Sequence, residues 1–412
     1  MEDNRKNKKK FQYIAIGVVL LLINVVVAIT LIMKDKQKKE QGNNTEPETT
    51  THVDTYEELV AKGDEYSNSG DNDKAIEEYL KALELNNKAD LKLKVANIYI
   101  MEGTEGKGLS YLYQILDDTK GAEEGKEIRD DVYKSIIDIY LKAEDNDAAY
   151  RLINIADEEY PGAFENYMSE NKVTAPTVNP YPAETGFVYF GEYPQDMIKA
   201  EDVPDYIKNA KYDENGTACI YGRKYAKVGD SYFSYSPIKW EILVDNGGSY
   251  ILMTDMLLDC EKYMEKLGDS SWDVSHLRTW LNTTYSGIAF NSEEHGLIQK
   301  TLVTRPENYF YSTFNGADSE DYVVVLSCRS LVNSQYGLRT EEQDRRVAYA
   351  TDYAVAKGLF ADEEGRGKWW TSSNGSNNKS YVFVNYDGVI SAGGELATNS
   401  KIGVRPVITV NK

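Results

Sequence analysis

The chain has 412 residues, more than one hydrophobic core usually organises, so we expect two or three domains. Its apolar content of 41% and charged content of 27% are ordinary for a folded soluble protein and exclude a protein with many membrane spans. The formal net charge is -21. Phosphate backbones need clustered Lys and Arg, so this acidic balance argues against nucleic acid as a partner.

The first predicted element is a membrane anchor. Residues 1–10 form a basic tail, and Phe11 to Met33 is a run of 23 residues without a charged side chain. As a helix this run would extend about 34 Å, enough for a bilayer core of about 30 Å. A cleavable signal peptide is the alternative, but its apolar region spans only about 7–15 residues. The pattern therefore predicts a single-pass signal anchor at the cell membrane.

The flanking charges give only a slight preference for orientation. Five Lys or Arg side chains precede the run and four follow it closely. The positive-inside rule then favours a cytoplasmic N-terminus and an extracytoplasmic body. Residues 34–53 are polar and poor in aromatic side chains, which predicts a flexible linker.

Residues 54–165 show helical periodicity and a degenerate internal repeat. Small and large side chains alternate at fixed positions of a 34-residue unit, namely Gly63, Tyr66, Ala75, Tyr79 and Ala82. The same register recurs at Ala96, Tyr99, Gly108, Leu112 and Ile115, and again at Tyr140, Ala149, Ile153, Ala156 and Pro161. This region resembles three tetratricopeptide repeats. The resemblance implies paired antiparallel helices and a protein or peptide partner; a generic helical bundle or a structural spacer is the alternative.

Residues 166–186 carry three prolines without clear periodicity and are interpreted as a second linker. Residues 187–412 then predict an α+β domain with a mostly antiparallel sheet. Its strands are expected at 187–190, 238–244, 250–254, 322–326, 368–372, 381–385, 389–392 and 404–410, and its helices at 275–282, 291–300 and 351–357.

Six ordered landmarks of this domain carry a family resemblance. They are FGEYPQ (190–195), IKWEIL (238–243), SWDVSHLRTWLN (271–282), VVVLS (323–327), KWWTSS (368–373) and GVRPVITV (403–410). Together they resemble an uncharacterised bacterial surface-protein domain of unknown function. The order of helix, irregular loops, tryptophan-rich strand and final arginine-containing strand also resembles C-type-lectin-like folds. Neither resemblance implies an activity.

The standard catalytic motifs are absent from the sequence. It contains no nucleophile elbow, P-loop, zinc-protease helix or EF-hand loop. The three cysteines form no C-x-x-C pair and are interpreted as small buried side chains, although one bridge remains open. His276 is interpreted as structural. No catalytic residue, metal or cofactor is predicted, and whether the chain is an enzyme stays open, with a non-enzymatic role favoured.

Five side chains are candidates for ligand binding in the C-terminal domain: Trp272, Arg278, Trp369, Trp370 and Arg405. Three indoles could form a platform for a sugar or peptide, with the two arginines beside it. The alternative is packing for the tryptophans and pairing with buried carboxylates for the arginines. Asp318, Glu320 and Asp321 offer oxygen ligands for calcium, but a solvated acidic loop is favoured.

These patterns favour a membrane-anchored scaffold. The helical repeats would recruit a protein partner, and the C-terminal domain would recognise a ligand of the cell envelope. An envelope-modifying enzyme with its site in the C-terminal loops is the alternative, and turnover would distinguish the two.

Overall fold

The computed structural model describes residues 54–412 except 123–124, 305–307, 309, 314–315 and 339. The predicted anchor at Phe11 to Met33 and the linker at 34–53 lie outside this range. Across the described residues, no helix combines the length and apolarity needed to cross a bilayer. Residues Tyr56–Lys412 form one compact unit.

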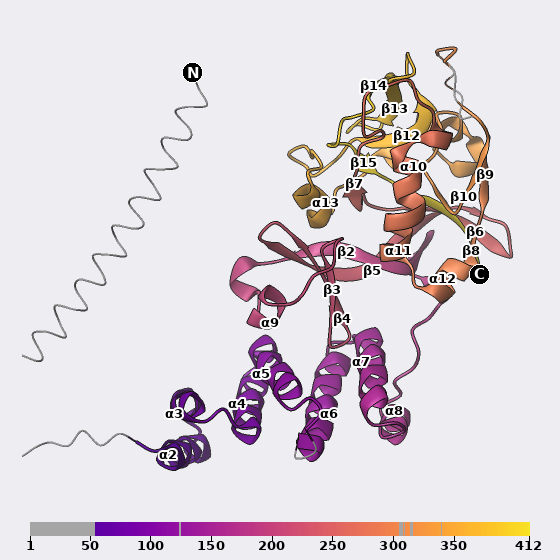
Figure 1. Ribbon diagram of the computed structural model, residues 1–412. Helices are drawn as coiled ribbons and strands as arrows, with labels where there is room; N and C mark the ends of the chain where they lie inside the picture. Colours follow the sequence, from indigo (N-terminus) through magenta and orange to yellow (C-terminus); the bar gives the residue numbers. More distant parts are fainter. Residues whose placement is uncertain (1–53, 123–124, 305–307, 309, 314–315, 339) are drawn as a thin grey trace, which may run out of the picture. The chain divides into compact units, whose positions relative to one another are not determined.

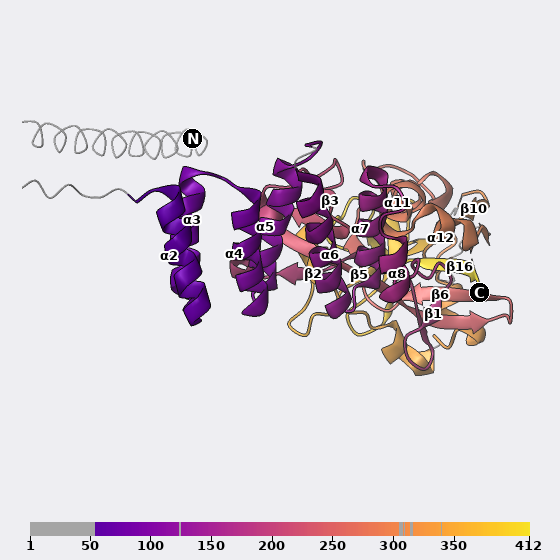
Figure 2. The same cartoon turned by 90° about the horizontal axis from the view of Figure 1, so that it is seen from below.

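The N-terminal part of this unit is helical, as predicted. Six helices follow one another in three packed pairs and lie side by side in both views (Figures 1 and 2). Their bounds are α2 Tyr56–Ser69, α3 Asn72–Leu85, α4 Ala89–Met101, α5 Glu105–Asp118, α6 Lys126–Lys142 and α7 Asn146–Glu159. The Asp71 carboxylate caps α3 and the Asp145 carboxylate caps α7, so orphan amides at both helix starts are satisfied.

Close helix approach depends on small residues at the predicted positions. A Cβ atom on Gly63 of α2 would lie only 2.4 Å from the Tyr79 ring of α3. Ala75 and Ala82 are fully buried in the same cluster, where Tyr79 is 2% exposed. The glycine therefore makes room for the tyrosine that fills the space between the two helices.

The segment predicted as an irregular linker, 166–186, contains regular structure. Helix α8 covers Glu165–Glu170, and the short strand β1 covers Tyr181–Pro182. The buried Phe164 ring packs against Tyr133 of α6, with ring centroids 6.0 Å apart. This contact holds the start of the segment against the helical layer, which the proline content did not reveal.

The C-terminal part is rich in antiparallel sheet, as predicted. A nine-stranded sheet has the main order β1-β2-β5-β6-β16-β11, with β3–β4 attached to β5 and β8 attached to β16. Their bounds are β2 Phe187–Ile198, β3 Thr217–Ile220, β4 Arg223–Val228, β5 Ser231–Asp245, β6 Ser249–Thr254, β8 Ile298–Gln299, β11 Val323–Val324 and β16 Val407–Asn411.

A second sheet has the order β14-β13-β12-β15-β7, and all its pairs are antiparallel except β12 with β15. Its strands are β7 Asp259–Cys260, β12 Trp369–Asn374, β13 Ser380–Val384, β14 Ile390–Leu396 and β15 Gly403–Val404. Strands β9 Thr301–Val303 and β10 Ser319–Asp321 form a separate pair. One continuous hydrophobic cluster contains side chains from both larger sheets.

Short helices connect these strands. They are α9 Asp205–Lys208, α10 His276–Trp280, α11 Ser286–Ala289, α12 Ser292–Leu297 and α13 Asp352–Lys357, and the π-helical turn η4 Leu281–Tyr285 joins α10 to α11. A capping box of Asn291 and Glu294 begins α12, and the helix ends at Leu297 rather than at the predicted Lys300.

Strand β2 is much longer than its predicted range. The sequence pattern predicts an end at Phe190, before Gly191-Glu192-Tyr193-Pro194-Gln195. Instead β2 continues to Ile198. A first register shift against β5 includes Gly191, Pro194 stays paired with Tyr235, and a second shift follows at Gln195. Gly191 has a φ of 68°, which fits a bulge, so the strand continues past this residue without ending.

We predict that Gly63→Ala lowers the free energy of unfolding by about 1–3 kcal/mol, because the added methyl group overlaps the Tyr79 ring. Gly296→Ala is the matched control, since Gly296 also lies in a helix and a Cβ atom there would have no neighbour within 4 Å. Helix propensity alone would make both changes stabilising. Chemical denaturation distinguishes the two expectations, and equal stabilisation of both variants would contradict the close approach.

Candidate functional site

The three candidate tryptophans lie inside the C-terminal domain. Trp272, Trp369 and Trp370 are each 0% exposed. Each indole N–H donates to a protein acceptor: to Asp321 Oδ2 at 3.1 Å, to the Arg346 carbonyl at 2.9 Å and to the Glu261 carbonyl at 2.8 Å, respectively. The structure therefore places these rings in the core and brings none of them to an open platform.

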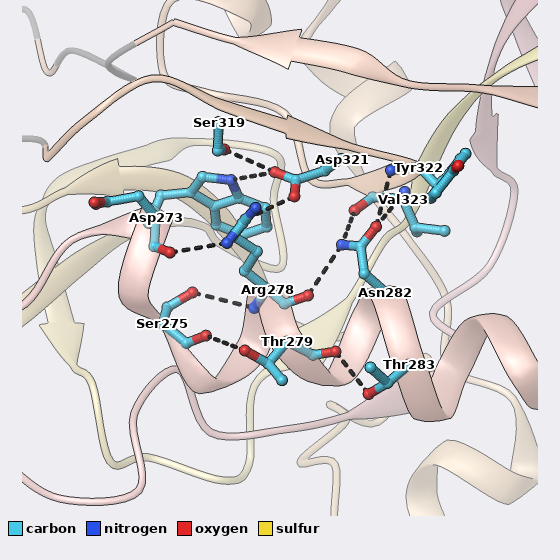
Figure 3. Close-up of polar contacts among 11 residues, drawn as sticks. Asp273, Ser275, Arg278, Thr279, Asn282, Thr283, Ser319, Asp321, Tyr322 and Val323 are labelled. Carbon is cyan, nitrogen blue, oxygen red and sulfur yellow. Dashed lines mark hydrogen bonds and ion pairs between the residues drawn. The ribbon is translucent and has the colours of Figure 1, made fainter.

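Arg278 belongs to a polar network around a buried carboxylate (Figure 3). Its Nε donates to Asp321 Oδ1 at 2.6 Å, and its Nη1 donates to the Asp273 carbonyl at 2.9 Å. Ser319 Oγ adds a 2.8 Å hydrogen bond to Asp321 Oδ2, beside the bond from Trp272. Asp321 is 3% exposed and accepts from three side chains. The network joins α10 to β10 and matches the alternative interpretation of Arg278 as a fold-holding residue.

In the next helical turn, Asn282 forms a second set of hydrogen bonds that connect the helix to a strand. Its Oδ1 accepts from the backbone amides of Tyr322 at 2.9 Å and Val323 at 3.0 Å, and its Nδ2 donates to the Val323 carbonyl at 2.8 Å. The amide side chain thus pairs with the strand backbone as a neighbouring strand would (Figure 3). Asn282 ends the SWDVSHLRTWLN landmark, so this landmark encodes contacts between a helix and two strands.

Arg405 is buried in a different part of the core. Its Nε donates to the Thr254 carbonyl at 2.8 Å, and its Nη2 lies 3.6 Å from Glu241 Oε2. Burial lowers the pKa of this guanidinium to about 10, although Glu241 opposes the shift. Glu241 also accepts from Arg345 Nε at 2.9 Å. The two arginine candidates, Arg278 and Arg405, are therefore held by separate carboxylates and do not form one site.

Other residues singled out in the sequence also have protein partners. His276 lies 3.4 Å from Glu261 and 3.3 Å from Glu265. Within the described ranges, no three His, Cys, Asp or Glu side chains are grouped to hold a metal ion. The three cysteines are not joined by any disulfide in the part of the chain that the structure describes; Cys260 and Cys328 are buried as expected, whereas Cys219 is exposed in β3, contrary to the expectation.

A buried titratable group that the sequence did not indicate lies on β7. Asp259 is 2% exposed, accepts from Tyr193 Oη at 2.8 Å and accepts from the Cys260 amide at 2.7 Å. Burial raises the pKa of Asp259 to about 6, against the opposing effect of these hydrogen bonds. Burial likewise raises the pKa of the neighbouring Cys260 thiol to about 12.

The helical and sheet regions meet where the β3–β4 hairpin reaches the helices (Figure 1). Tyr221, at the hairpin turn, stacks on Tyr113 of α5 with ring centroids 4.6 Å apart. Tyr140 of α6 donates to the Tyr221 carbonyl at 2.7 Å, and its hydroxyl lies 2.5 Å from that of Tyr113. A Cβ atom on Gly222 would lie 2.4 Å from the Ala148 carbonyl of α7, so only glycine fits this turn.

A cavity of about 520 Å³ lies beside this contact, and we call it the junction cavity. The α6–α7 turn, the start of α7, and strands β1, β2, β4 and β5 contribute to its wall. Its charged lining consists of Glu144, Asp145, Asp147, Arg151, Glu192, Arg223 and Lys224, and its aromatic lining consists of Tyr181, Tyr225 and Tyr235. It combines volume with polar groups that converge from the helical and the sheet region.

The charges of the junction cavity are largely paired. Arg223 Nε lies 2.9 Å from Asp145 Oδ2, and its guanidinium stands 4.2 Å from the Tyr140 ring centroid. Arg151 and Lys224 both reach Glu192 Oε1, at 3.3 and 2.5 Å. The Arg223–Asp145 and Arg151–Glu192 pairs join the helical region to strand residues, so the wall of the cavity also connects the two regions.

The α2–α4 groove is a second concave surface, of about 380 Å³. It is lined by Asp64, Ser67, Asn68, Tyr79, Lys94, Asn97, Ile98 and Met101. Asp64 accepts from Lys94 and from the Tyr79 hydroxyl, each at 2.6 Å. Met101 is 72% exposed, so the groove offers charge, amides and an apolar side chain to a partner.

Sequence reasoning missed the junction cavity because its residues come from six separate elements. The signal that was present is the hairpin pattern of TACIYGRKYAKV, in which Tyr221-Gly222 separates two short strands. The pattern predicts a turn but does not say that the turn docks against helices about 70 to 110 residues earlier in the chain.

We predict that Asp321→Asn lowers the free energy of unfolding by about 3 kcal/mol, because it leaves Arg278 beside a neutral amide and replaces an acceptor by a donor. Glu320→Gln is the matched control, because Glu320 is the exposed residue between Ser319 and Asp321 on β10. Denaturant titration compares the variants. Equal stability of the Asp321→Asn and Glu320→Gln variants would contradict a structural role of the Arg278 network.

We predict a pH dependence that belongs to Asp259. Its pKa is raised in the folded chain to about 6, so folding favours the protonated acid. The contribution of protonated Asp259 to the stability of the folded chain is complete below the ordinary carboxyl pKa of about 4. This contribution is lost as pH rises to about 6. The difference in stability between the unaltered chain and Asp259→Asn should therefore change over this window, to the disadvantage of the unaltered chain at pH 7. A stability difference between the two chains that does not change between pH 4 and 7 would contradict the raised pKa of Asp259.

Comparison with known proteins identifies only the C-terminal part. No curated protein and no solved structure matches the chain. Four of the six sequence landmarks, from SWDVSHLRTWLN onward, lie in the segment that a family model matches, whereas FGEYPQ and IKWEIL precede it. Residues 247–412 are similar to the family described as a domain of unknown function, DUF6273.

Proposed function

We propose that the chain is a membrane-anchored scaffold that recruits a protein partner through its helical region. The observation that carries this proposal is the α2–α4 groove. Strands and loops of the C-terminal region contact α5, α6 and α7 at the hairpin, whereas the residues that line the groove come from α2, α3 and α4. The groove therefore lies away from the intramolecular contact and is suited to a separate partner.

The chemistry of the groove favours an extended peptide. Asn68 and Asn97 carry amides that can both donate to and accept from a peptide backbone. Lys94 adds a cation and Met101 adds an adaptable apolar contact. Helical repeats of the tetratricopeptide type, which residues 54–165 resemble, use such surfaces for proteins and peptides. The same resemblance supports assigning the three helix pairs to three repeats.

The anchor completes the proposal. The uncharged run from Phe11 to Met33 would hold the folded body at the membrane, and residues 34–53 would serve as its tether. The slight charge preference favours an extracytoplasmic body. Resistance of the full chain to alkaline extraction from membranes, compared with residues 34–412, tests this part; release of both chains would exclude the anchor.

The C-terminal region is proposed to recognise a ligand. The C-type-lectin-like resemblance supports only a fold, and the buried positions of Trp272, Trp369 and Trp370 do not favour a surface made by these rings. We therefore assign ligand recognition to the junction cavity rather than to these tryptophans.

The experiment that tests the scaffold is an affinity pull-down from a native membrane and envelope extract. The bait is residues 56–412, which form one compact unit. Lys94→Glu reverses a groove charge, and Lys81→Glu reverses a charge on α3 outside the groove lining; both lysine side chains are 46% exposed and ion-paired. We expect one protein to be captured by the unaltered and Lys81→Glu baits and lost with Lys94→Glu. Capture that is equal for all three baits would place the partner surface elsewhere.

A further inference from the structure

The junction cavity has the size and position of a small-molecule site. Its volume of about 520 Å³ lies within the range of about 300–1,000 Å³ typical of such sites, which often form where domains meet. Its walls come from both the helical and the sheet region. The chemistry of the lining restricts which class of molecule can bind.

The three cations of the lining do not favour a phosphate or carboxylate ligand. Arg223 is paired with Asp145, and Lys224 is paired with Glu192. Arg151 donates to the Gly222 carbonyl at 2.6 Å and also lies next to Glu192. An anion would have to displace these carboxylates, which are held in place by the fold.

The carboxylates of the lining do not create a strong cation site either. They exceed the cations by one, and two of the four are already bonded to arginine or lysine. An apolar ligand is also disfavoured, because seven charged side chains would lose water without gaining hydrogen bonds. A molecule with many neutral donors and acceptors can form hydrogen bonds with all the polar groups of this lining. Hydroxyl groups bond to carboxylates and to cationic N–H groups alike.

Aromatic rings complete the recognition surface. Tyr181 is 37% exposed, and its ring lies 5.5 Å from that of Tyr189 between centroids. Tyr225 and Tyr235 line the same cavity. Tyr181 and Asp147 both line the cavity. Burial, together with the charge of Asp147, raises the pKa of Tyr181 to about 12. An exposed ring beside carboxylates offers a flat apolar face to the C–H side of a sugar and polar groups to its hydroxyls.

We propose that the junction cavity binds a neutral saccharide, with one sugar ring stacked on Tyr181 and its hydroxyls bonded to Asp147, Glu192 and Lys224. This inference deepens the ligand-recognition part of the proposed function. It does not depend on the α2–α4 groove, because the two surfaces share no lining residue.

The test is calorimetric titration of the full chain with three neutral disaccharides, namely cellobiose, maltose and di-N-acetylchitobiose. Glucuronic acid and glucosamine serve as anionic and cationic probes. The variants are Tyr181→Ala and, as a matched control, Tyr311→Ala, which removes a tyrosine of similar exposure (41%) outside the cavity. Thermal unfolding of each variant shows whether the fold is retained.

We expect saturable binding of at least one neutral disaccharide, weakened at least about tenfold by Tyr181→Ala and unchanged by Tyr311→Ala. Absence of saturable binding by all three disaccharides overturns the proposal. Equal binding by the Tyr181→Ala variant, or tighter binding of either charged probe, also overturns it. None of these outcomes bears on the pull-down with Lys94→Glu, so failure of the cavity and failure of the scaffold are separable.

Discussion

The described unit depends on one contact, the docking of the β3–β4 turn against α5, α6 and α7. The Tyr221 ring stacks on Tyr113, and the Tyr221 carbonyl accepts from Tyr140. Gly222, which has no side chain, packs against the start of α7. The Tyr113 and Tyr140 hydroxyls, both buried, are satisfied through each other and through this turn. Without the turn, two phenols and the apolar helix surface around them would face water. The free energy gained by burying this surface would then be lost.

The same contact determines where the two proposed binding surfaces lie. Because the hairpin docks on α5–α7, the junction cavity forms beside it, and its paired charges join residues of different regions. The groove on α2–α4 remains available for another molecule. A partner and a ligand would then bind to one compact unit at two places, which suits a scaffold that brings them together.

Much of the fold was predictable because local patterns matched global packing. The helix pairs follow from the spacing of Gly63, Ala75 and Tyr79, and the Asn291 capping box follows from local hydrogen bonding. The length of β2 was mispredicted because Gly191 is accommodated in a register shift, and Pro194 is paired with Tyr235, only when β5 lies alongside. The proposed binding surfaces were less predictable. Tryptophans and arginines suggest binding in a sequence, but only burial and partners show that Trp369 and Arg405 are used inside the core. The junction cavity needs tertiary contacts that no local pattern encodes.

The boundary of the matched family segment has a consequence for sheet architecture. The segment begins at Gly247, directly after β5 and before β6. In this chain β6 is bonded to β5 on one side and to β16 on the other. A protein made of the matched segment alone would turn β6 into an open edge with apolar side chains such as Leu252 and Met253, a surface that invites pairing between chains. In this chain, β5, which precedes the matched segment, therefore covers the edge of β6 that the segment alone would leave open to another chain.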